Sequence, residues 1–252
     1  MEYEVTTLRS EGFLMALDTE FIRTEEGSMV YDIGYIVIDK TTGEVVYRRG
    51  FVITDTINLF KKEVYCNKYR YKNAFLPCFY KKNKRYYKNN HDYSSVSFKE
   101  AISEIEETMK TFKIDFFGAY NCHVDINALI ETGRYFNVSI PFKKVVIKEV
   151  PKRTNKNVYI QYDAFDIYKP SAEILLKRPD YIQFTIEAGF LTDKNNIKAS
   201  AEAVYAYLIK DKKHKEKHNG LSDAIEEAYI THWLTTQNIQ FTKKVSKKSV
   251  KI

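Results

Sequence analysis

The sequence predicts an α/β domain built on one sheet, with an antiparallel meander at one edge. Two observations predict this fold class. Residues 12–54 contain three runs rich in apolar residues, each short enough for a strand. After residue 97, further apolar runs alternate with segments in which apolar residues recur every three or four positions. Strands followed by alternating strands and helices are typical of helices packed on a sheet.

The first three strands are expected to be neighbours joined by short turns. Gly43 supplies the turn between the second strand and the third, because glycine adopts turn conformations at little steric cost. The sequence therefore predicts an antiparallel meander of three strands, over Phe13–Phe21, Asp32–Asp39 and Glu44–Thr54.

The spacing of apolar residues and the presence of capping residues predict the helices. Ser97 is a good N-cap for a helix over 97–112, and Glu100 completes a capping box. Asn121 is expected to cap a helix over His123–Tyr135. Three more helices and two more strands are expected after residue 112: helices over 180–189, 199–210 and 219–235, and strands over Ile114–Tyr120 and Val158–Ala164.

Composition bounds the class of protein. The 252 residues are 44% hydrophobic and carry a net charge of +7, which suits a polyanionic partner. This length suffices for one large domain or two small ones. We expect a single domain over 1–240, followed by a disordered lysine-rich tail over 241–252. The three cysteines form no CxxC motif, so we expect free thiols and no disulfide partner. Without an apolar run near the ~18 residues of a membrane span, and with an acidic N-terminus, the protein is expected to be cytoplasmic.

Residues 55–96 interrupt the α/β pattern with a basic, tyrosine-rich insertion. Between Lys61 and Lys88, ten basic residues stand against one acid, Glu63, and six tyrosines are interleaved. Because basic side chains bind phosphates and aromatic faces stack on bases, the insertion is predicted to contact nucleic acid. The alternative is a surface segment whose aromatic residues anchor it to the domain. The residues predicted to bind nucleic acid are Lys81, Lys82, Lys84, Arg85, Tyr86 and Tyr87.

Two acidic residues stand near the end of the first strand. Asp18 and Glu20 are two apart, so they point to the same side of an extended chain, whereas Thr19 points to the other. Two carboxylates on one side of a buried strand repel each other and resist desolvation, and a cation between them relieves both costs. The pair alone is a weak signal, because a solvated strand end is the alternative. Together with acidic residues downstream, it indicates a metal-dependent active site.

Two later motifs add candidate residues. Asp125 stands in the first turn of a helix that follows a strand, where complementing the helix dipole is the alternative role. His218 precedes the last helix, and Asp223 lies inside that helix near the border of its apolar face. The alternative for His218 is a surface residue in a turn rich in lysine and histidine.

In chain order, these five residues resemble the DEDD exonuclease superfamily in its histidine variant, DEDDh. Relatives include the proofreading epsilon subunit of bacterial DNA polymerase III and ribonuclease T. The family pattern is Asp-x-Glu on the first strand, an Asp that opens a middle helix, and His-x-x-x-x-Asp near the end. The matching residues here are Asp18 and Glu20, then Asp125, then His218 and Asp223.

The resemblance extends to neighbouring residues and covers about residues 12–236. Similar stretches are Leu-Asp-Thr-Glu-Phe, Tyr-Asn-x-x-x-Asp-x-x-Ala-Leu and His-x-Gly-x-x-Asp-Ala. Ala188–Thr192 and Ala199–Ala203 look similar to exonuclease-like proteins of bacteriophages. Val124 departs from the Phe often found in relatives, and Gly220 from the Ala of many, but neither change replaces a ligand.

The resemblance implies a ribonuclease H-like fold, a mixed five-stranded sheet flanked by helices, and 3′-5′ exonuclease activity that releases 5′-mononucleotides. It implies two Mg²⁺ or Mn²⁺ ions, which suit oxygen ligands and a phosphate substrate. Asp18 would bridge the ions, with Glu20 and Asp223 on the nucleophile side, and Asp125 would bind the other ion directly or through water. His218 would be the general base. The implied partner is the 3′ end of single-stranded DNA or RNA.

Two other functions stay open at this point. A non-catalytic module could use the insertion to hold single strands, and would bind them without Mg²⁺ and form no product. An endonuclease or resolvase could be built on the same sheet, and would cut a closed circle. The intact set of five residues favours the exonuclease over the first, and the histidine favours it over the second.

Overall fold

The structure, a computed structural model, describes residues 12–115, 117–141, 143–148, 156–237 and 243–250. Ten strands lie in this part of the chain: β1 (Phe13–Thr24), β2 (Gly27–Asp39), β3 (Val45–Ile53), β4 (Lys68–Tyr71), β5 (Ala74–Pro77), β6 (Tyr93–Val96), β7 (Phe117–Ala119), β8 (Lys143–Lys148), β9 (Lys156–Asp166) and β10 (Lys243–Val250). Nine helices lie in the same ranges: α1 (Thr54–Leu59), α2 (Lys61–Val64), α3 (Tyr80–Asn89), α4 (Phe98–Thr111), α5 (His123–Tyr135), α6 (Tyr168–Leu175), α7 (Pro179–Ala188), α8 (Ala201–Leu208) and α9 (Gly220–Thr236).

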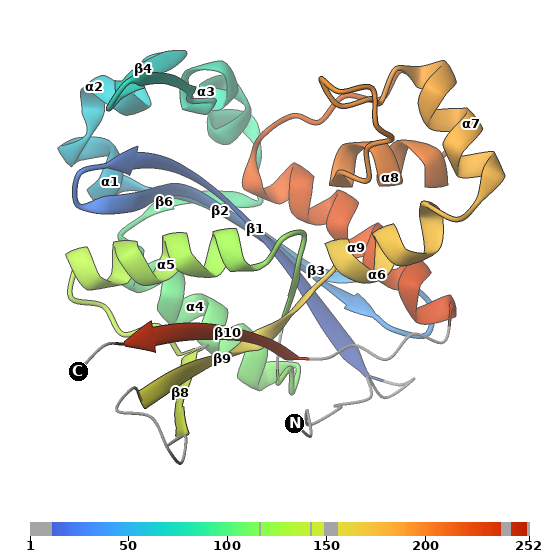
Figure 1. Cartoon of the computed structure of the whole chain (residues 1–252). Helices are drawn as coiled ribbons and strands as arrows, with labels where there is room; N and C mark the ends of the chain where they lie inside the picture. Colours follow the sequence, from blue (N-terminus) through green and yellow to red (C-terminus); the bar gives the residue numbers. More distant parts are fainter. Residues whose placement is uncertain (1–11, 116, 142, 149–155, 238–242, 251–252) are drawn as a thin grey trace.

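Eight strands form one mixed sheet (Figure 1). Its continuous order is β10-β9-β7-β1-β2-β3-β6, and β8 also pairs with β9. β1, β2 and β3 form the expected antiparallel meander, whereas β7 runs parallel to β1 and β6 parallel to β3. The α/β class is confirmed, but the sheet from β9 to β6 has six strands instead of five, and β8 and β10 extend it.

The extra strands carry little signal in the sequence, for physical reasons. β6 has four residues and lies inside the basic insertion, so no alternation of apolar residues marks it. β10 pairs antiparallel with β9, whereas the sequence predicts a disordered tail over 241–252. Pairing with an edge strand uses backbone groups and requires no apolar pattern. A lysine-rich segment can therefore form a strand that its side chains do not predict.

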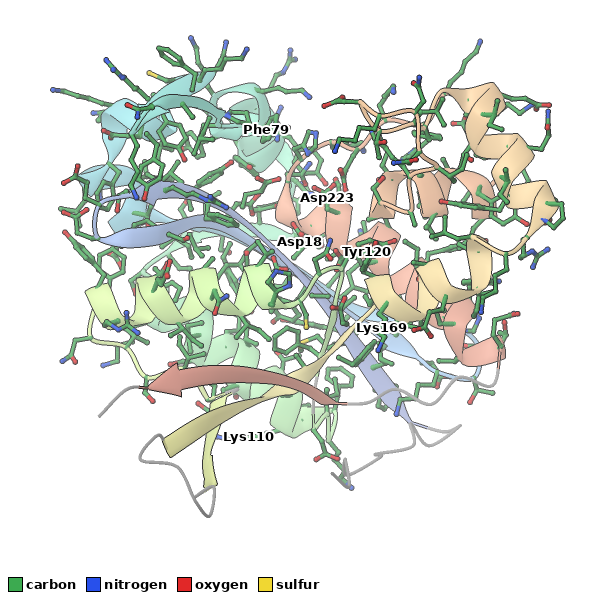
Figure 2. The ribbon with its side chains drawn as sticks, in the orientation of Figure 1. Asp18, Phe79, Lys110, Tyr120, Lys169 and Asp223 are labelled. Carbon is green, nitrogen blue, oxygen red and sulfur yellow. The ribbon has the colours of Figure 1, made fainter. Side chains whose placement is uncertain are left out.

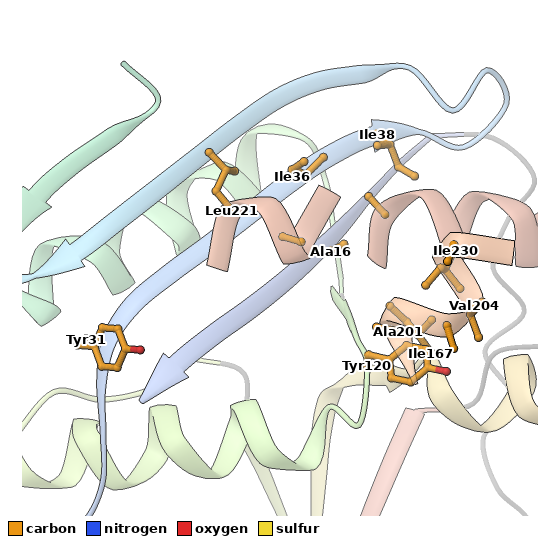
Figure 3. Close-up of a cluster of buried hydrophobic side chains, with 14 of the residues drawn as sticks. Ala16, Tyr31, Ile36, Ile38, Tyr120, Ile167, Ala201, Val204, Leu221 and Ile230 are labelled. Carbon is orange, nitrogen blue, oxygen red and sulfur yellow. The ribbon is translucent and has the colours of Figure 1, made fainter. Parts of the chain in front are cut away.

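The centre of the sheet is buried on both faces, and residues of β1 alternate between two cores. Leu14 and Ala16 belong to the core under α8 and α9, which Figure 3 shows in part. Met15 and Leu17 belong to the core under α4 and α5. A strand covered on both faces reads as a continuous apolar run, as this one does before Asp18.

Most predicted helices are confirmed within two residues of their expected bounds. Ser97 caps α4 and forms the expected capping box with Glu100. The expected cap of α5 is wrong, because the N-cap is Cys122, and Asn121 instead takes a left-handed conformation with φ of 57°. Asparagine tolerates this conformation better than most residues, which explains its place in the turn before α5.

The insertion folds onto the edge of the domain near the start of α9 (Figure 1). It contains α1, α2, the β4–β5 hairpin, α3 and β6. Tyr69, Tyr80 and Tyr87 are buried and join the core that also contains β1. The Arg23 backbone N–H donates to the Tyr69 hydroxyl, which fixes the hairpin to β1. The alternative role of the tyrosines, as anchors to the domain, is therefore correct for these three.

No helix in the described ranges is long and apolar enough to cross a membrane.

The first turn of α9 lies directly against the backbone of the sheet. Gly34 on β2 pairs with Asp18 on β1, and Gly220 begins α9 above this pair. A methyl group on Gly34 would lie 1.9 Å from the Leu221 backbone nitrogen, and one on Gly220 would lie 2.4 Å from the Gly34 nitrogen. Only glycine at both positions permits this approach, which brings α9 to the acidic end of β1.

We expect Gly34→Ala to destabilise the fold by about 3 kcal/mol, the upper end of the cost of overpacking a core, because backbone atoms cannot give way as side chains do. Urea denaturation followed by circular dichroism would measure the change. An unchanged denaturation midpoint would contradict the close approach of α9 to β2.

Candidate active site

The candidate site lies where β1, α5 and the start of α9 meet. Asp18 and Glu20 lie on β1, and Asp125 lies in the first turn of α5. The Thr19 backbone N–H and hydroxyl both donate to Asp125 Oδ1, at 3.0 and 2.8 Å. Thr19, between Asp18 and Glu20, thus fixes the carboxylate of α5 close enough for its charge to act on both.

The start of α9 brings the last two candidates to β1. Asn219 caps the helix by accepting from the Ser222 backbone N–H at 3.1 Å. His218 precedes this cap with φ of 56°. Glu20, His218 and Asp223 each offer a ligand atom, and these atoms all lie within 4.8 Å of one another. Figure 2 shows Asp18 on β1 beside Asp223 on α9.

Burial raises the pKa of every carboxylate in the cluster, and the charges of neighbouring carboxylates raise it further. Burial raises the pKa of Asp18 well above its usual range, and four neighbouring carboxylates raise it further: Asp125, Glu227, Asp223 and Glu20. Burial likewise raises the pKa of Asp125 to about 7 and that of Asp223 to about 10. Glu20 has a pKa raised well above its usual range, by burial and then by the charge of Asp32.

The cluster suits a hard divalent cation. Asp223 Oδ1 is buried and accepts no hydrogen bond from the described residues, so a lone pair is left for a ligand bond. Mg²⁺ and Mn²⁺ prefer carboxylate oxygens, and a positive ion would relieve the repulsion that raises these pKa values. The donor set of Asp18, Glu20, Asp125 and Asp223 therefore fits the expected ions.

Sequence reasoning missed Glu227. It lies one turn after Asp223 on α9, is 3% exposed, and has an unpaired Oε2 among the described residues. Burial raises its pKa well above its usual range, and the charge of Asp125 raises it further. An acid four residues after Asp223 lies on the same helix face. That spacing is the signal that would have found it.

Asp32 is a second missed residue, and it positions α9. Its Oδ2 accepts from the Gly220 backbone N–H at 2.9 Å and from the Tyr87 hydroxyl at 2.8 Å. The Tyr93 hydroxyl donates to the same oxygen at 3.4 Å and accepts from the Leu221 backbone N–H. Asp32 thus satisfies the first N–H group of α9, which otherwise lacks a partner at a helix start.

The residues predicted to bind nucleic acid divide into two groups. Lys81, Lys82, Lys84 and Arg85 are exposed on α3. Tyr86 is half-buried, and its hydroxyl lies 3.4 Å from Ser222 Oγ. Tyr87 is 7% exposed and bound to Asp32, so its ring does not offer a face for stacking on a base. Aromatic residues in a basic helix suggest a binding surface, but here the face of α3 that carries Tyr80 and Tyr87 packs in the core.

We expect Asp18→Asn to raise the melting temperature in chelator at pH 8 by about 2–4 °C, equivalent to about 1 kcal/mol in a domain of this size. The folded pKa of Asp18 lies above the unfolded value, so wild-type stability is lost as the pH rises through the folded pKa. The gain should therefore shrink as the pH is lowered towards about 4. Scanning calorimetry from pH 4 to 8 measures it.

With Mg²⁺ added, the wild type should melt at the higher temperature, because the ion stabilises it more than it stabilises Asp18→Asn. Exposed Asp193→Asn is the matched control and should change neither melting curve. Equal melting of Asp18→Asn and wild type at every pH would contradict the repulsive cluster.

Comparison with known proteins identifies the fold. No protein-family model and no curated protein matches the sequence. Several solved structures are similar, and three of them match nearly the whole chain. The first is a 3′-exonuclease whose structure is described as 3′-end specific recognition of a histone mRNA stem-loop. It has a TM-score of 0.56 and 10% identity, over 96% of this chain and 92% of that one.

The second is the nuclease domain of 3′hExo, a DEDDh family member bound to rAMP, with a TM-score of 0.55 and 10% identity over 95% and 98% of the two chains. The third is a full-length 3′-exonuclease, with a TM-score of 0.56 and 11% identity over 95% of this chain and 67% of that one. The expected resemblance is confirmed at the level of structure: this chain has the ribonuclease H-like fold of DEDDh 3′-exonucleases.

Proposed function

We propose that the protein is a metal-dependent 3′-5′ exonuclease that hydrolyses phosphodiester bonds at nucleic-acid 3′ ends and releases 5′-mononucleotides. One observation carries the proposal. Glu20 of β1 meets His218 and Asp223 within 4.8 Å, and the charges of Asp125 and Asp223 act on Asp18. Five residues from distant parts of the sequence form one anionic cluster on a fold similar to DEDDh nucleases.

The carboxylates of Asp18, Glu20, Asp125 and Asp223 would hold Mg²⁺ or Mn²⁺. When bound, such ions neutralise charge on the phosphate and lower the pKa of a bound water. The protein supplies the rigid placement of the ligands: Thr19 orients Asp125, and the Asn219 cap and Asp32 orient the helix that carries Asp223.

His218 would accept the proton of the attacking water. The water oxygen forms a bond to phosphorus, and the bond from phosphorus to the 3′ oxygen of the preceding nucleotide breaks. That 3′ oxygen takes up a proton from solvent to become the new 3′-hydroxyl, and the terminal nucleotide leaves as a 5′-monophosphate. Burial lowers the pKa of His218, and the charge of Lys82 lowers it further, so the imidazole is neutral near pH 7 and ready to accept that proton.

A nucleic-acid substrate is supported by charge. Lys81, Lys82, Lys84 and Arg85 lie on α3, the helix of the insertion that touches the His218 segment. The similar solved structures are described with an mRNA stem-loop and with rAMP. We propose that α3 guides the strand whose 3′ end enters the carboxylate cluster.

The proposal predicts stepwise shortening of single-stranded DNA or RNA from the 3′ end, with Mg²⁺ required. In gel assays, 5′-labelled strands should give a ladder, 3′-labelled strands should release a labelled mononucleotide, and chelator should stop both. Asp18→Ala should abolish product because the variant lacks a metal ligand. His218→Ala should slow turnover roughly 10²–10⁴-fold, the usual value of a general base.

Other products would distinguish the alternatives. Cutting of a closed single-stranded circle would indicate an endonuclease. Binding with no product at any metal concentration, in wild type and Asp18→Ala alike, would indicate a non-catalytic module and would refute the exonuclease.

Replacing Lys81, Lys82, Lys84 and Arg85 with Gln should weaken binding to single strands and flatten its salt dependence, by about 0.7 in log–log slope for each phosphate that the variant no longer neutralises. Fluorescence anisotropy in chelator measures binding without cleavage. The charge-matched control replaces three exposed lysines and one arginine of α4, the turn after it, and α5: Lys99, Lys110, Lys113 and Arg134. If both variants keep the wild-type slope, α3 is not the binding surface.

A further inference from the structure

The start of α3 is in direct contact with His218. The ring of Phe79, the residue before α3, stacks on the imidazole with a centroid distance of 4.1 Å and an angle of 19° between the planes. This stacking joins the insertion to the candidate general base. Figure 2 shows Phe79 above Asp18 and Asp223.

A second interaction holds the backbone of the same histidine. Asn83 lies one turn into α3 and is 7% exposed. Its side-chain amide donates to the His218 carbonyl at 2.5 Å and to the Lys217 carbonyl at 3.3 Å. The first turn of α3 thus holds His218 twice: Phe79 contacts its ring, and Asn83 binds its backbone carbonyl.

His218 needs such support. It lies in a stretch, 211–219, with no helix or strand, and its φ of 56° is unfavourable for a residue with a side chain. A side chain on such a segment samples several rotamers unless packing selects one. The stacked ring of Phe79 selects the rotamer in which the imidazole lies beside Glu20 and Asp223, and the two amide hydrogen bonds hold the backbone that carries it.

The same segment is tied to the carboxylates. The Phe79 backbone N–H donates to the Tyr31 hydroxyl at 3.2 Å, and that hydroxyl donates to Glu20 Oε2 at 3.4 Å. Phe79 is therefore connected to Glu20 through the Tyr31 hydroxyl and to His218 through ring stacking. A shift of the segment would move the histidine relative to the carboxylates.

We propose that Phe79 and Asn83 are positioning residues for His218, so that the insertion completes the active site in addition to any interaction with the strand. This inference rests on the proposed role of His218 as general base. It predicts that removing either side chain lowers turnover without weakening substrate binding.

Phe79→Leu removes the ring and keeps an apolar side chain, and Asn83→Ala removes the amide and keeps the ring of Phe79. Each should lower kcat by about 10–100-fold, because small misplacement of a catalytic group costs up to about 10²-fold, with KM within about threefold. Phe79→Trp retains a stacking ring and should restore turnover relative to Phe79→Leu. Phe75→Leu, in the same insertion but 72% exposed, is the matched control and should match wild type.

A second measurement does not depend on activity. In protein labelled with ¹³C-histidine, ring currents from Phe79 should shift the His218 ring protons upfield, with His218→Ala assigning the signals. Phe79→Leu should abolish the shift, and Asn83→Ala should reduce it or broaden the signals. Circular dichroism checks that each variant is folded.

The outcomes separate this inference from the proposed function. In one outcome, wild type degrades strands and His218→Ala is slow, but folded Phe79→Leu and Asn83→Ala turn over like wild type. That result would refute the positioning role and leave the exonuclease standing. If wild type forms no product with Mg²⁺ or Mn²⁺, the exonuclease is refuted and the positioning role with it, whatever the ring-current shift.

Discussion

The close approach of the first turn of α9 to the backbone of β1 and β2 determines the rest of the site. Gly34 and Gly220 leave no side chain between helix and sheet, and Asp32 accepts the first N–H group of the helix. Both features bring α9 closer to the sheet than side-chain packing would allow. The consequence is that Asp223, in the first turn, comes within reach of Glu20. A helix held away from the sheet by side chains at these two positions would place Asp223 farther from Glu20.

That placement has an electrostatic cost which the surrounding core must offset. The raised pKa values of Asp18, Asp125 and Asp223 mean that the folded chain holds these groups against their tendency to be charged. Apolar side chains on both faces of β1 supply compensating burial. Asp18 and Glu20 contribute the repulsion, whereas the apolar residues before them and Ile22 after them contribute burial. One strand therefore carries both the candidate ligands and the core residues that offset their cost.

How much of the site the sequence predicts depends on whether the signal is local. Asp18, Glu20 and Asp125 follow from strand alternation and a helix start, and α5 has its expected bounds. Asp32 is the first residue of a predicted strand and nothing marks it as functional, since its role depends on α9, 188 residues away. The tyrosines of α3 give a mixed signal because a basic helix can be exposed on one face and packed on the other. The stacking of Phe79 on His218 exists only in the folded chain.

The basic insertion also bears on the protonation of the site. A histidine among carboxylates ordinarily has a raised pKa, because negative charge favours the imidazolium. Here burial lowers the pKa of His218, Lys82 lowers it further, and the opposing effect of Glu202 is smaller. The positive charge of Lys82 on α3 thus adds to the effect of burial and favours the neutral imidazole, the form that can accept a proton. If α3 guides the strand and His218 is the general base, as proposed above, Lys82 would serve both roles, by attracting phosphates and by keeping the imidazole neutral.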